Sequence, residues 1–190
     1  MKIIGITYYD GKENVVLKSD SSMTVNRKPL FVPEAIGDLR VLPCWVLRVS
    51  RLGKCIAERY ASRYYDAVAA GLDFFGADML QAAKIGGRPW TEAVAFEGSL
   101  AFGEMSEIRD QKSDVRWRLM RGDEQVAEEL WNDDMREAFD RAVAKASELL
   151  TIRQGDLIYV AKNMQPWQLQ TNDVIRAVNG DEEILYCKIK

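Results

Sequence analysis

The sequence predicts an α+β fold in which β-strands predominate, with about three helices in a single domain spanning residues 1–190. Short runs rich in Val, Ile and Leu recur along the chain between turn signals, which is typical of strands. The predicted strands do not alternate regularly with helices, which argues against a doubly wound parallel sheet. No internal repeat, low-complexity tract or linker divides the chain.

The first predicted elements are strands. β-Branched residues at 2–7 and 14–18 flank a turn that contains Asp10-Gly11, so these two segments are expected to form a hairpin. A third strand is predicted at 39–50, because this run is rich in Val and Leu.

Two helices are predicted next. From residue 58 onward, Tyr60, Tyr64 and Val68 recur at four-residue spacing, which indicates a helix that ends at a C-cap on Gly71. A shorter helix is expected at 78–85, because two glycines and a proline follow it and stop it.

The second half of the chain opens with a second predicted hairpin. Residues 113–120 alternate between apolar and polar side chains, and a turn leads into a strand at 125–129.

A long amphipathic helix is then predicted at 132–150. Asn132 is a favourable N-cap for it, and the two aspartates that follow suit the positive end of a helix dipole.

Three further strands are predicted to complete the fold. They cover residues 155–160, 173–178 and 183–189. The last two are separated by Asn179-Gly180-Asp181, a strong signal for a tight hairpin turn.

The chain contains no histidine. This excludes a Ser-His-Asp triad, a Cys-His pair and any imidazole-ligated metal, so chemistry would have to use carboxylates, Lys, Tyr, Ser or Cys. The 26 Lys and Arg against 29 Asp and Glu give a formal net charge of −3. A nucleic-acid-binding domain usually carries a basic excess, so we expect no nucleic-acid partner.

The cysteines and the hydropathy bear on the compartment. Cys44, Cys55 and Cys187 are widely spaced and form no CxxC pair, which fits a reducing compartment. The N-terminal residues lack the apolar stretch of a signal peptide. No stretch approaches the roughly 20 apolar residues of a membrane span. We therefore expect a cytoplasmic protein that does not bind a membrane.

One carboxylate stands out by its surroundings. Asp73 lies between Leu72 and Phe74-Phe75, so it is expected to be partly buried. A buried carboxylate needs a partner, a metal ion or a shifted pKa. The structural interpretation, a helix cap or a salt bridge, is favoured over a functional one on this observation alone.

Several short motifs together point to a family. The segment Thr151-Ile152-Arg153-Gln154-Gly155-Asp156-Leu157-Ile158-Tyr159 follows the long predicted helix, and Leu169-Gln170-Thr171-Asn172-Asp173-Val174-Ile175 precedes the closing hairpin. Earlier motifs are Arg51-Leu52-Gly53-Lys54, Gly71-Leu72-Asp73-Phe74, Gly87-Arg88-Pro89-Trp90 and Phe96-Glu97-Gly98-Ser99. In their order and spacing, these motifs resemble the fumarylacetoacetate hydrolase family.

This resemblance implies a mixed β-roll that assembles as a homodimer. Active members of the family hydrolyse carbon–carbon bonds in β-diketone acids, or decarboxylate, hydrate or isomerise related keto acids. They use Mg²⁺, Ca²⁺ or a similar hard divalent ion, held by three carboxylates, to stabilise an enolate. A lysine assists, and hydrolytic members activate water with a His–Glu pair.

Most of the functional residues that the resemblance implies are missing here. Asp73 matches the third metal carboxylate, but Leu42 and Cys44 stand at the positions of the Glu-x-Glu pair. Val94 replaces the lysine, and the substrate loop reads Val160-Ala161-Lys162-Asn163. The expected histidine is absent. One carboxylate does not hold Mg²⁺, so we expect no bound metal cofactor.

The favoured hypothesis is a catalytically degenerate paralogue that keeps the fold and the dimer. It could bind a small carboxylic acid, or form a hetero-oligomer with an active paralogue. A second hypothesis is a metal-independent lyase or isomerase acting on a keto acid in a rebuilt pocket. Its candidate residues are Asp73, Asp78, Glu97, Lys162 and Cys44.

A third hypothesis is a structural or interaction subunit whose pocket is filled. Leu42, Trp45 and Val94 are bulky apolar residues at or beside the positions where the family has polar ones. If they pack the pocket shut, the chain would have no room for a ligand.

Overall fold

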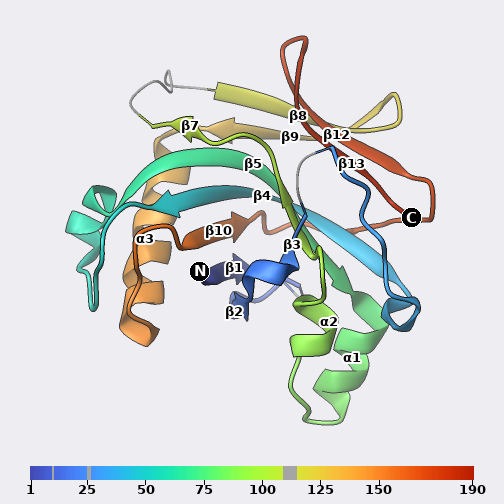
Figure 1. Ribbon diagram of the computed structural model, residues 1–190, viewed down its shortest axis with the longest axis horizontal. Helices are drawn as coiled ribbons and strands as arrows, with labels where there is room; N and C mark the ends of the chain where they lie inside the picture. Colours follow the sequence, from blue (N-terminus) through green and yellow to red (C-terminus); the bar gives the residue numbers. More distant parts are fainter. Residues whose placement is uncertain (10, 25–26, 109–114) are drawn as a thin grey trace.

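The structure, a computed structural model, describes residues 1–9, 11–24, 27–108 and 115–190. Its larger sheet has the strand order β2-β1-β10-β4-β5-β6-β3, with β11 paired to β4 and β7 paired to β5 (Figure 1). The pairs β1–β10 and β3–β6 are parallel and the others are antiparallel. The strands of this sheet are β1 (Ile3–Thr7), β2 (Asn14–Lys18), β3 (Met23–Thr24), β4 (Leu39–Val49), β5 (Tyr65–Gly76), β6 (Leu100–Phe102), β7 (Ser106–Glu107), β10 (Leu157–Ala161) and β11 (Trp167–Gln168).

A smaller antiparallel sheet lies across the long strands β4 and β5 (Figure 1). Its order is β13-β12-β8-β9, formed by two hairpins. Its strands are β8 (Val115–Arg121), β9 (Glu124–Trp131), β12 (Val174–Asn179) and β13 (Glu182–Lys188). The predictions of both hairpins in this sheet are confirmed, although residues 113 and 114 of the first lie outside the described part of the chain. The hairpin predicted at 2–7 and 14–18 is also confirmed, as β1 and β2 of the larger sheet.

The structure describes three α-helices. They are α1 (Ala77–Ile85), α2 (Thr91–Val94) and α3 (Asp133–Leu149), with 3-10 turns η1 (Asp20–Ser22), η2 (Glu34–Ile36) and η3 (Glu58–Arg63). The predictions of α1 and α3 are confirmed. The Asn132 side chain accepts a hydrogen bond from the Met135 backbone N–H at 3.0 Å, as expected of an N-cap.

The helix predicted from residue 58 to Gly71 is wrong. Only the 3-10 turn η3 forms there, and the chain then enters β5 at Tyr65. Strand β5 pairs with β4 along its whole length and is buried on both faces. A strand buried on both faces shows no alternation of polarity, so its run of Ala, Val and Leu resembled a buried helix.

The larger sheet curls into a roll. Six inter-strand steps separate β2 from β3, which is about 29 Å in a flat sheet. Yet only Ser19–Ser22 lies between these strands, and the chain from Lys18 to Met23 reaches at most about 18 Å. The sheet must therefore curve until its two ends meet, which agrees with the predicted mixed β-roll.

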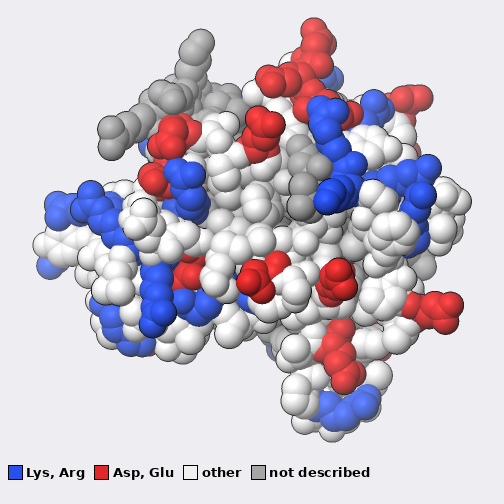
Figure 2. Space-filling model, viewed as in Figure 1, with Lys and Arg blue, Asp and Glu red and all other residues white. Residues whose placement is uncertain are grey.

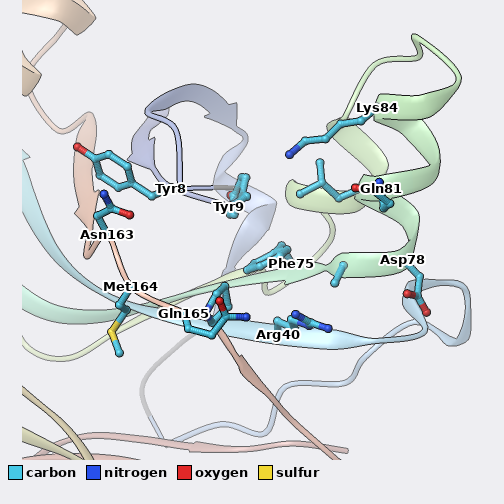
Figure 3. A pocket seen from close by; sticks show the side chains of 14 residues that line it. Tyr8, Tyr9, Arg40, Phe75, Asp78, Gln81, Lys84, Asn163, Met164 and Gln165 are labelled. Carbon is cyan, nitrogen blue, oxygen red and sulfur yellow. The ribbon is translucent and has the colours of Figure 1, made fainter.

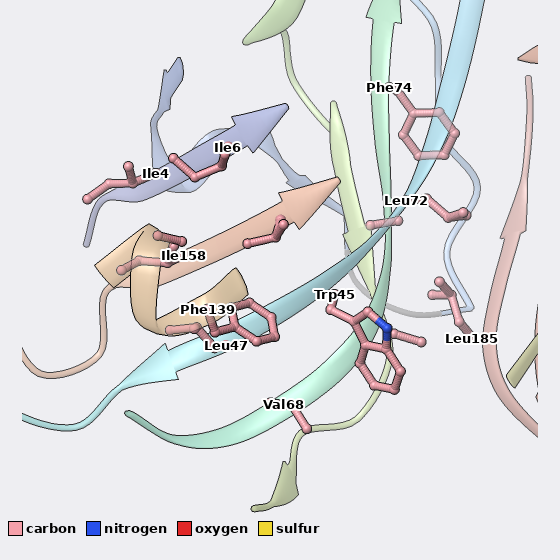
Figure 4. Close-up of a cluster of buried hydrophobic side chains, with 14 of the residues drawn as sticks. Ile4, Ile6, Trp45, Leu47, Val68, Leu72, Phe74, Phe139, Ile158 and Leu185 are labelled. Atoms are coloured by element: carbon pink, nitrogen blue, oxygen red, sulfur yellow. The ribbon is translucent and has the colours of Figure 1, made fainter. Parts of the chain in front are cut away.

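The two faces of the roll bury different clusters. Outward-facing side chains of β4, β5 and β10 pack under α3 and the smaller sheet (Figure 4). Trp45 belongs to this outer cluster, where its ring lies 5.2 Å from that of Trp131 and 5.9 Å from that of Trp117. The inner cluster fills the interior of the roll and includes Leu42, Cys44 and Tyr159.

Among the described residues, the helices bear on membrane spanning and one face of the molecule shows the distribution of charge. No helix in the described ranges is long and apolar enough to cross a membrane. The face seen in Figure 2 mixes both signs of charge, without a broad area of one sign among the residues described there.

Candidate functional site

Asp73 lies inside the roll, near the end of β5, and has no exposed surface. Its neighbours Leu72 and Phe74 point to the opposite face, into the outer cluster. The helix-cap interpretation of Asp73 is wrong, because the residue lies in a strand rather than at a helix end. The alternative, a salt bridge, is confirmed: the Lys18 ammonium lies 2.7 Å from Asp73 Oδ1.

Hydroxyl groups complete the surroundings of the Asp73 carboxylate. Oδ1 accepts hydrogen bonds from the hydroxyls of Tyr159 at 3.1 Å and Tyr9 at 3.4 Å. Oδ2 accepts one from the Thr7 hydroxyl at 3.0 Å. The carboxylate is thus held by donors from three other strands or their ends.

Lys18, the last residue of β2, is also fully buried. Besides Asp73, its ammonium donates to the Ser99 carbonyl at 2.9 Å and to the Ser99 hydroxyl at 3.1 Å. The sequence reasoning did not single out this lysine. The available signal was its spacing: two residues after Val16, it shares the inward face of β2 with that buried side chain.

A glycine makes room for Tyr159. Gly5 pairs with Tyr159 across the parallel strands β1 and β10. A Cβ atom at Gly5 would lie 2.2 Å from Cζ of the tyrosine ring, far inside contact distance. The ring can therefore lie across β1, with its hydroxyl at Asp73, only because residue 5 has no side chain.

The electrostatics keep the two phenols beside Asp73 protonated. Burial raises the pKa of Tyr9 and of Tyr159 well above the ordinary value, and the Asp73 charge raises both further. Burial lowers the pKa of the Lys18 ammonium, and the attraction of Asp73 opposes this change. The phenols therefore act here as hydrogen-bond donors, not as bases.

The positions that the resemblance assigned to the metal pair lie beside Asp73. Leu42 is directly opposite Asp73 in the β4–β5 register, and Cys44 is opposite Gly71. Val94, from α2, belongs to the same inner cluster. Burial and the Asp73 charge raise the pKa of the Cys44 thiol well above its usual range, so it is neutral.

These residues do not fit a hard divalent ion. Mg²⁺ and Ca²⁺ bind through several oxygen ligands, whereas Leu42 offers methyl groups and Cys44 a protonated thiol. The Lys18 ammonium already lies against the one carboxylate and would repel a second cation. Within the described ranges, no three His, Cys, Asp or Glu side chains gather in a way that could hold a metal.

A cavity of about 660 Å³ adjoins this buried pair. The rings of Tyr9 and Phe75 form part of its wall (Figure 3), with centroids 4.5 Å apart. Behind that wall, the Tyr9 hydroxyl donates a hydrogen bond to Asp73. The other polar side chains that line it and that the structure describes are Tyr8, Arg40, Asp78, Gln81, Lys84, Asn163 and Gln165.

Two cations lie on different walls of this cavity. Arg40, from β4, is held by Asp38, whose Oδ2 atom accepts a hydrogen bond from Arg40 Nε at 2.9 Å and forms an ion pair with Nη2 at 2.8 Å. Lys84, from α1, extends toward Tyr9, and its ammonium lies 4.9 Å from the centroid of the Trp90 ring (Figure 3). The cavity therefore offers two cations, one of them paired with Asp38, and the Asp78 carboxylate, together with amide donors.

The remaining candidate residues do not converge on Asp73. Asp78 lines the cavity but is exposed and lies near Gly37, on the outer side of α1. Glu97 is exposed after α2. The Lys162 ammonium is ion-paired with Glu129 at 2.9 Å rather than with Asp73. Trp45, named as a possible pocket-filling residue, is on the opposite face of β4 because strand side chains alternate.

Comparison with solved structures supports the fold over the whole chain. Fumarylpyruvate hydrolase from Pseudomonas aeruginosa, solved in complex with Mn²⁺ and pyruvate, superposes with a TM-score of 0.81 at 16% identity, covering 99% of this chain and 88% of that one. The 5-carboxymethyl-2-hydroxymuconate delta-isomerase of Mycobacterium smegmatis gives a TM-score of 0.77 at 15% identity, covering 99% and 78%.

Curated relatives and a family model extend the likeness to the sequence. Mitochondrial oxaloacetate tautomerase FAHD1 from Mus musculus is 24% identical over 164 residues, covering 85% of this chain and 73% of the relative. The Bos taurus enzyme is 24% identical over 177 residues, covering 92% and 78%. The family model for the C-terminal region of fumarylacetoacetate (FAA) hydrolase matches residues 8–178. Because that match runs from the end of β1 almost to the end of β12, the chain belongs to the fumarylacetoacetate hydrolase family.

Proposed function

We propose that this chain is a metal-independent member of the family that binds a small carboxylic acid and has lost metal-dependent hydrolysis. The observation that carries the proposal is the position of Lys18. Its ammonium is ion-paired with Asp73, the one family carboxylate that this chain retains. A divalent ion and the ammonium would compete for the same carboxylate oxygen.

The surroundings of the pair support the same conclusion. Family members that hydrolyse β-diketone acids stabilise an enolate with a bound cation. Here Leu42 and Cys44 supply no charged oxygen, and both are buried. Tyr9 and Phe75 separate Asp73 from the cavity. An acid in the cavity would therefore contact protein side chains rather than a metal ion.

The lining of the cavity suits a small organic acid. Arg40 and Lys84 supply positive charge, and Gln81, Asn163 and Gln165 supply amide donors. Guanidinium and ammonium groups form the stronger, charge-assisted hydrogen bonds with carboxylates. The volume of about 660 Å³ is within the usual range of small-molecule pockets.

The proposal is tested by calorimetry of the purified chain with oxaloacetate, pyruvate and acetylpyruvate, in EDTA and in Mg²⁺ or Mn²⁺. We expect binding that is unaffected by the metal, and no metal-stimulated hydrolysis of acetylpyruvate. Arg40→Gln should weaken binding on the order of tenfold, because it removes a charge-assisted hydrogen bond. Lys54→Gln, an exposed change outside the cavity, is the control and should leave affinity unchanged.

Two results would contradict this function. One is hydrolysis that requires a divalent ion and stops in Asp73→Asn. The other is the absence of binding for all three acids at millimolar concentration. The second result would favour the remaining hypothesis, an interaction subunit without a ligand.

A second candidate is a metal-independent isomerase acting on a keto acid. It is favoured by the oxaloacetate tautomerases among the relatives, together with the hydrogen bond that links Asp73 to Tyr9 at the cavity wall. The test is the enol-to-keto conversion of oxaloacetate in EDTA, followed by ultraviolet absorbance. This candidate requires a chelator-resistant rate that falls in both Tyr9→Phe and Asp73→Asn. A rate equal to the buffer background would exclude it.

We also propose, from family membership, that the chain forms a homodimer or pairs with an active paralogue. Light scattering coupled to size-exclusion chromatography distinguishes these cases. A homodimer has twice the mass of the chain, whereas a chain that requires a paralogue elutes alone as a monomer.

A further inference from the structure

We propose that the Lys18 ammonium is a built-in cation that replaces a divalent metal in the interior of the roll and holds the buried Asp73 carboxylate in place. Neither side chain has any exposed area, and the ammonium lies 2.7 Å from Asp73 Oδ1. The inference rests on the metal-independent part of the proposed function, but it does not depend on acid binding in the cavity.

The hydrogen bonds around the pair are complete. An ammonium has three donors, and Lys18 directs them to Asp73 Oδ1, the Ser99 carbonyl and the Ser99 hydroxyl. The carboxylate accepts from hydroxyls at both of its oxygens. A fully satisfied buried network is stable, whereas a network that has lost one member is costly. The ammonium thus does what a coordinated ion would do for this carboxylate.

No other described charge neutralises Asp73. The ion pairs of the described residues give it one cationic partner, Lys18. The residues across the strand pair are Leu42 and the neutral Cys44 thiol. A buried carboxylate without a counter-charge is strongly destabilising, and so is a buried ammonium. Each member of the pair is therefore tolerated only because the other is present.

The position of Lys18 also gives the ammonium a role in closing the roll. Lys18 ends β2, at the seam where the chain crosses through Ser19–Ser22 to β3 on the other end of the sheet. Its partners are in the centre of the sheet, on β5, and in the segment just before β6. The ion pair consequently links β2, at the seam, to β5 on the opposite wall of the roll.

The test is a double-mutant cycle measured by denaturant unfolding without ligand. Lys18→Met keeps a long unbranched side chain and removes its charge. Asp73→Asn removes the opposite charge, and the third variant carries both changes. We expect each single change to lower the folding equilibrium constant about 100-fold or more. The double variant should be at least about tenfold more stable than Lys18→Met, because it leaves no unpaired charge.

A matched control is the surface pair of Lys145 and Glu13, whose side chains are 42% and 41% exposed. Lys145→Met should change the equilibrium constant by less than about fivefold, as is usual for surface ion pairs. If Lys18→Met does not fold while the double variant does, the proposal is supported. If the loss of stability in the double variant equals the sum of the two single losses, the two groups are not coupled and the proposal fails.

A second arm tests the replacement of the metal. The unfolding midpoint of the unmodified chain should be the same in EDTA and in millimolar Mg²⁺, Ca²⁺ or Mn²⁺, since a ligand raises stability only if the folded state binds it. A midpoint that rises with metal and no longer does so in Asp73→Asn would overturn the proposal. Failure of acid binding in the cavity would leave both arms intact, so the two proposals can fail separately.

Discussion

At the scale of single residues, the molecule uses a second buried carboxylate in a purely structural way. Asp156 is 3% exposed and lies just before β10. Its Oδ1 accepts from the Lys2 backbone N–H at 2.8 Å, and its Oδ2 accepts from the Lys2 ammonium at 2.5 Å and the Arg153 backbone N–H at 2.8 Å. These bonds fix the start of β10 against β1, its parallel partner.

This arrangement predicts a pH-dependent contribution to stability. Burial alone would raise the pKa of Asp156, but the hydrogen bonds from Lys2 and Arg153 outweigh it and lower the pKa. The contribution is therefore present above the unfolded-state pKa of about 3.9 and is lost as the pH falls through the lower folded-state pKa. Asp156→Asn should reduce the free energy of unfolding by about 1–3 kcal/mol at pH 7.

Urea unfolding of both proteins between pH 7 and pH 2 checks this prediction. The difference between them should begin to shrink below about pH 4, where the unfolded chain takes up a proton at this carboxylate, and should vanish below the lower folded-state pKa. A difference that stays constant down to pH 2 would show that the carboxylate charge is not what matters.

The candidate site could be predicted only in part at this scale. The resemblance directed attention to Asp73, Leu42 and Cys44, and the β4–β5 register places Leu42 directly opposite Asp73. Lys18 could not be assigned as the partner, because a lysine at the end of a strand is ordinarily exposed. Its burial depends on the curl of the sheet, which is set by contacts between distant segments.

At the scale of elements, a clear period of polarity makes a segment predictable from the sequence. The helix α3 and the β8–β9 hairpin each have one face in solvent, so their polarity repeats with a clear period. Strand β5 has no solvent-facing side, and its sequence carries no such period. The sequence therefore predicts these peripheral elements by their period, and the buried strands β1, β4 and β10 by their Val, Ile and Leu residues. It misassigns β5, the strand that carries Asp73, because that strand has no period and is rich in Ala, a good helix former.

The N-terminus of α3 allows a direct test of whether the predicted N-cap residue stabilises the protein. Asn132→Ala removes the hydrogen bond from the Asn132 side chain to the Met135 N–H. We expect a loss of about 1 kcal/mol in the free energy of unfolding, measured by urea titration. Asn132→Ser keeps an oxygen acceptor at this position and should lower the free energy of unfolding by at most about 0.3 kcal/mol. Equal losses for both variants would mean that the cap bond contributes nothing.

At the scale of the whole molecule, the two sheets share one core. Trp45 projects from the larger sheet, and Trp117 and Trp131 project from the smaller one to meet it. All three side chains are buried. The helix α3 contributes Phe139, whose ring lies 5.5 Å from that of Trp131. Neither sheet can lose this contact without exposing the aromatic surface of the other.

This shared core predicts a single cooperative unfolding transition. Tryptophan fluorescence reports on the junction between the sheets and far-ultraviolet circular dichroism on the strands of both, so the two urea transitions should coincide. Trp131→Ala should reduce the free energy of unfolding by about 3–5 kcal/mol and move both transitions together. Trp90→Ala, at a half-buried position near α2, is the control and should cost less. Two separate transitions, or a shift confined to fluorescence, would mean that the smaller sheet unfolds independently of the roll.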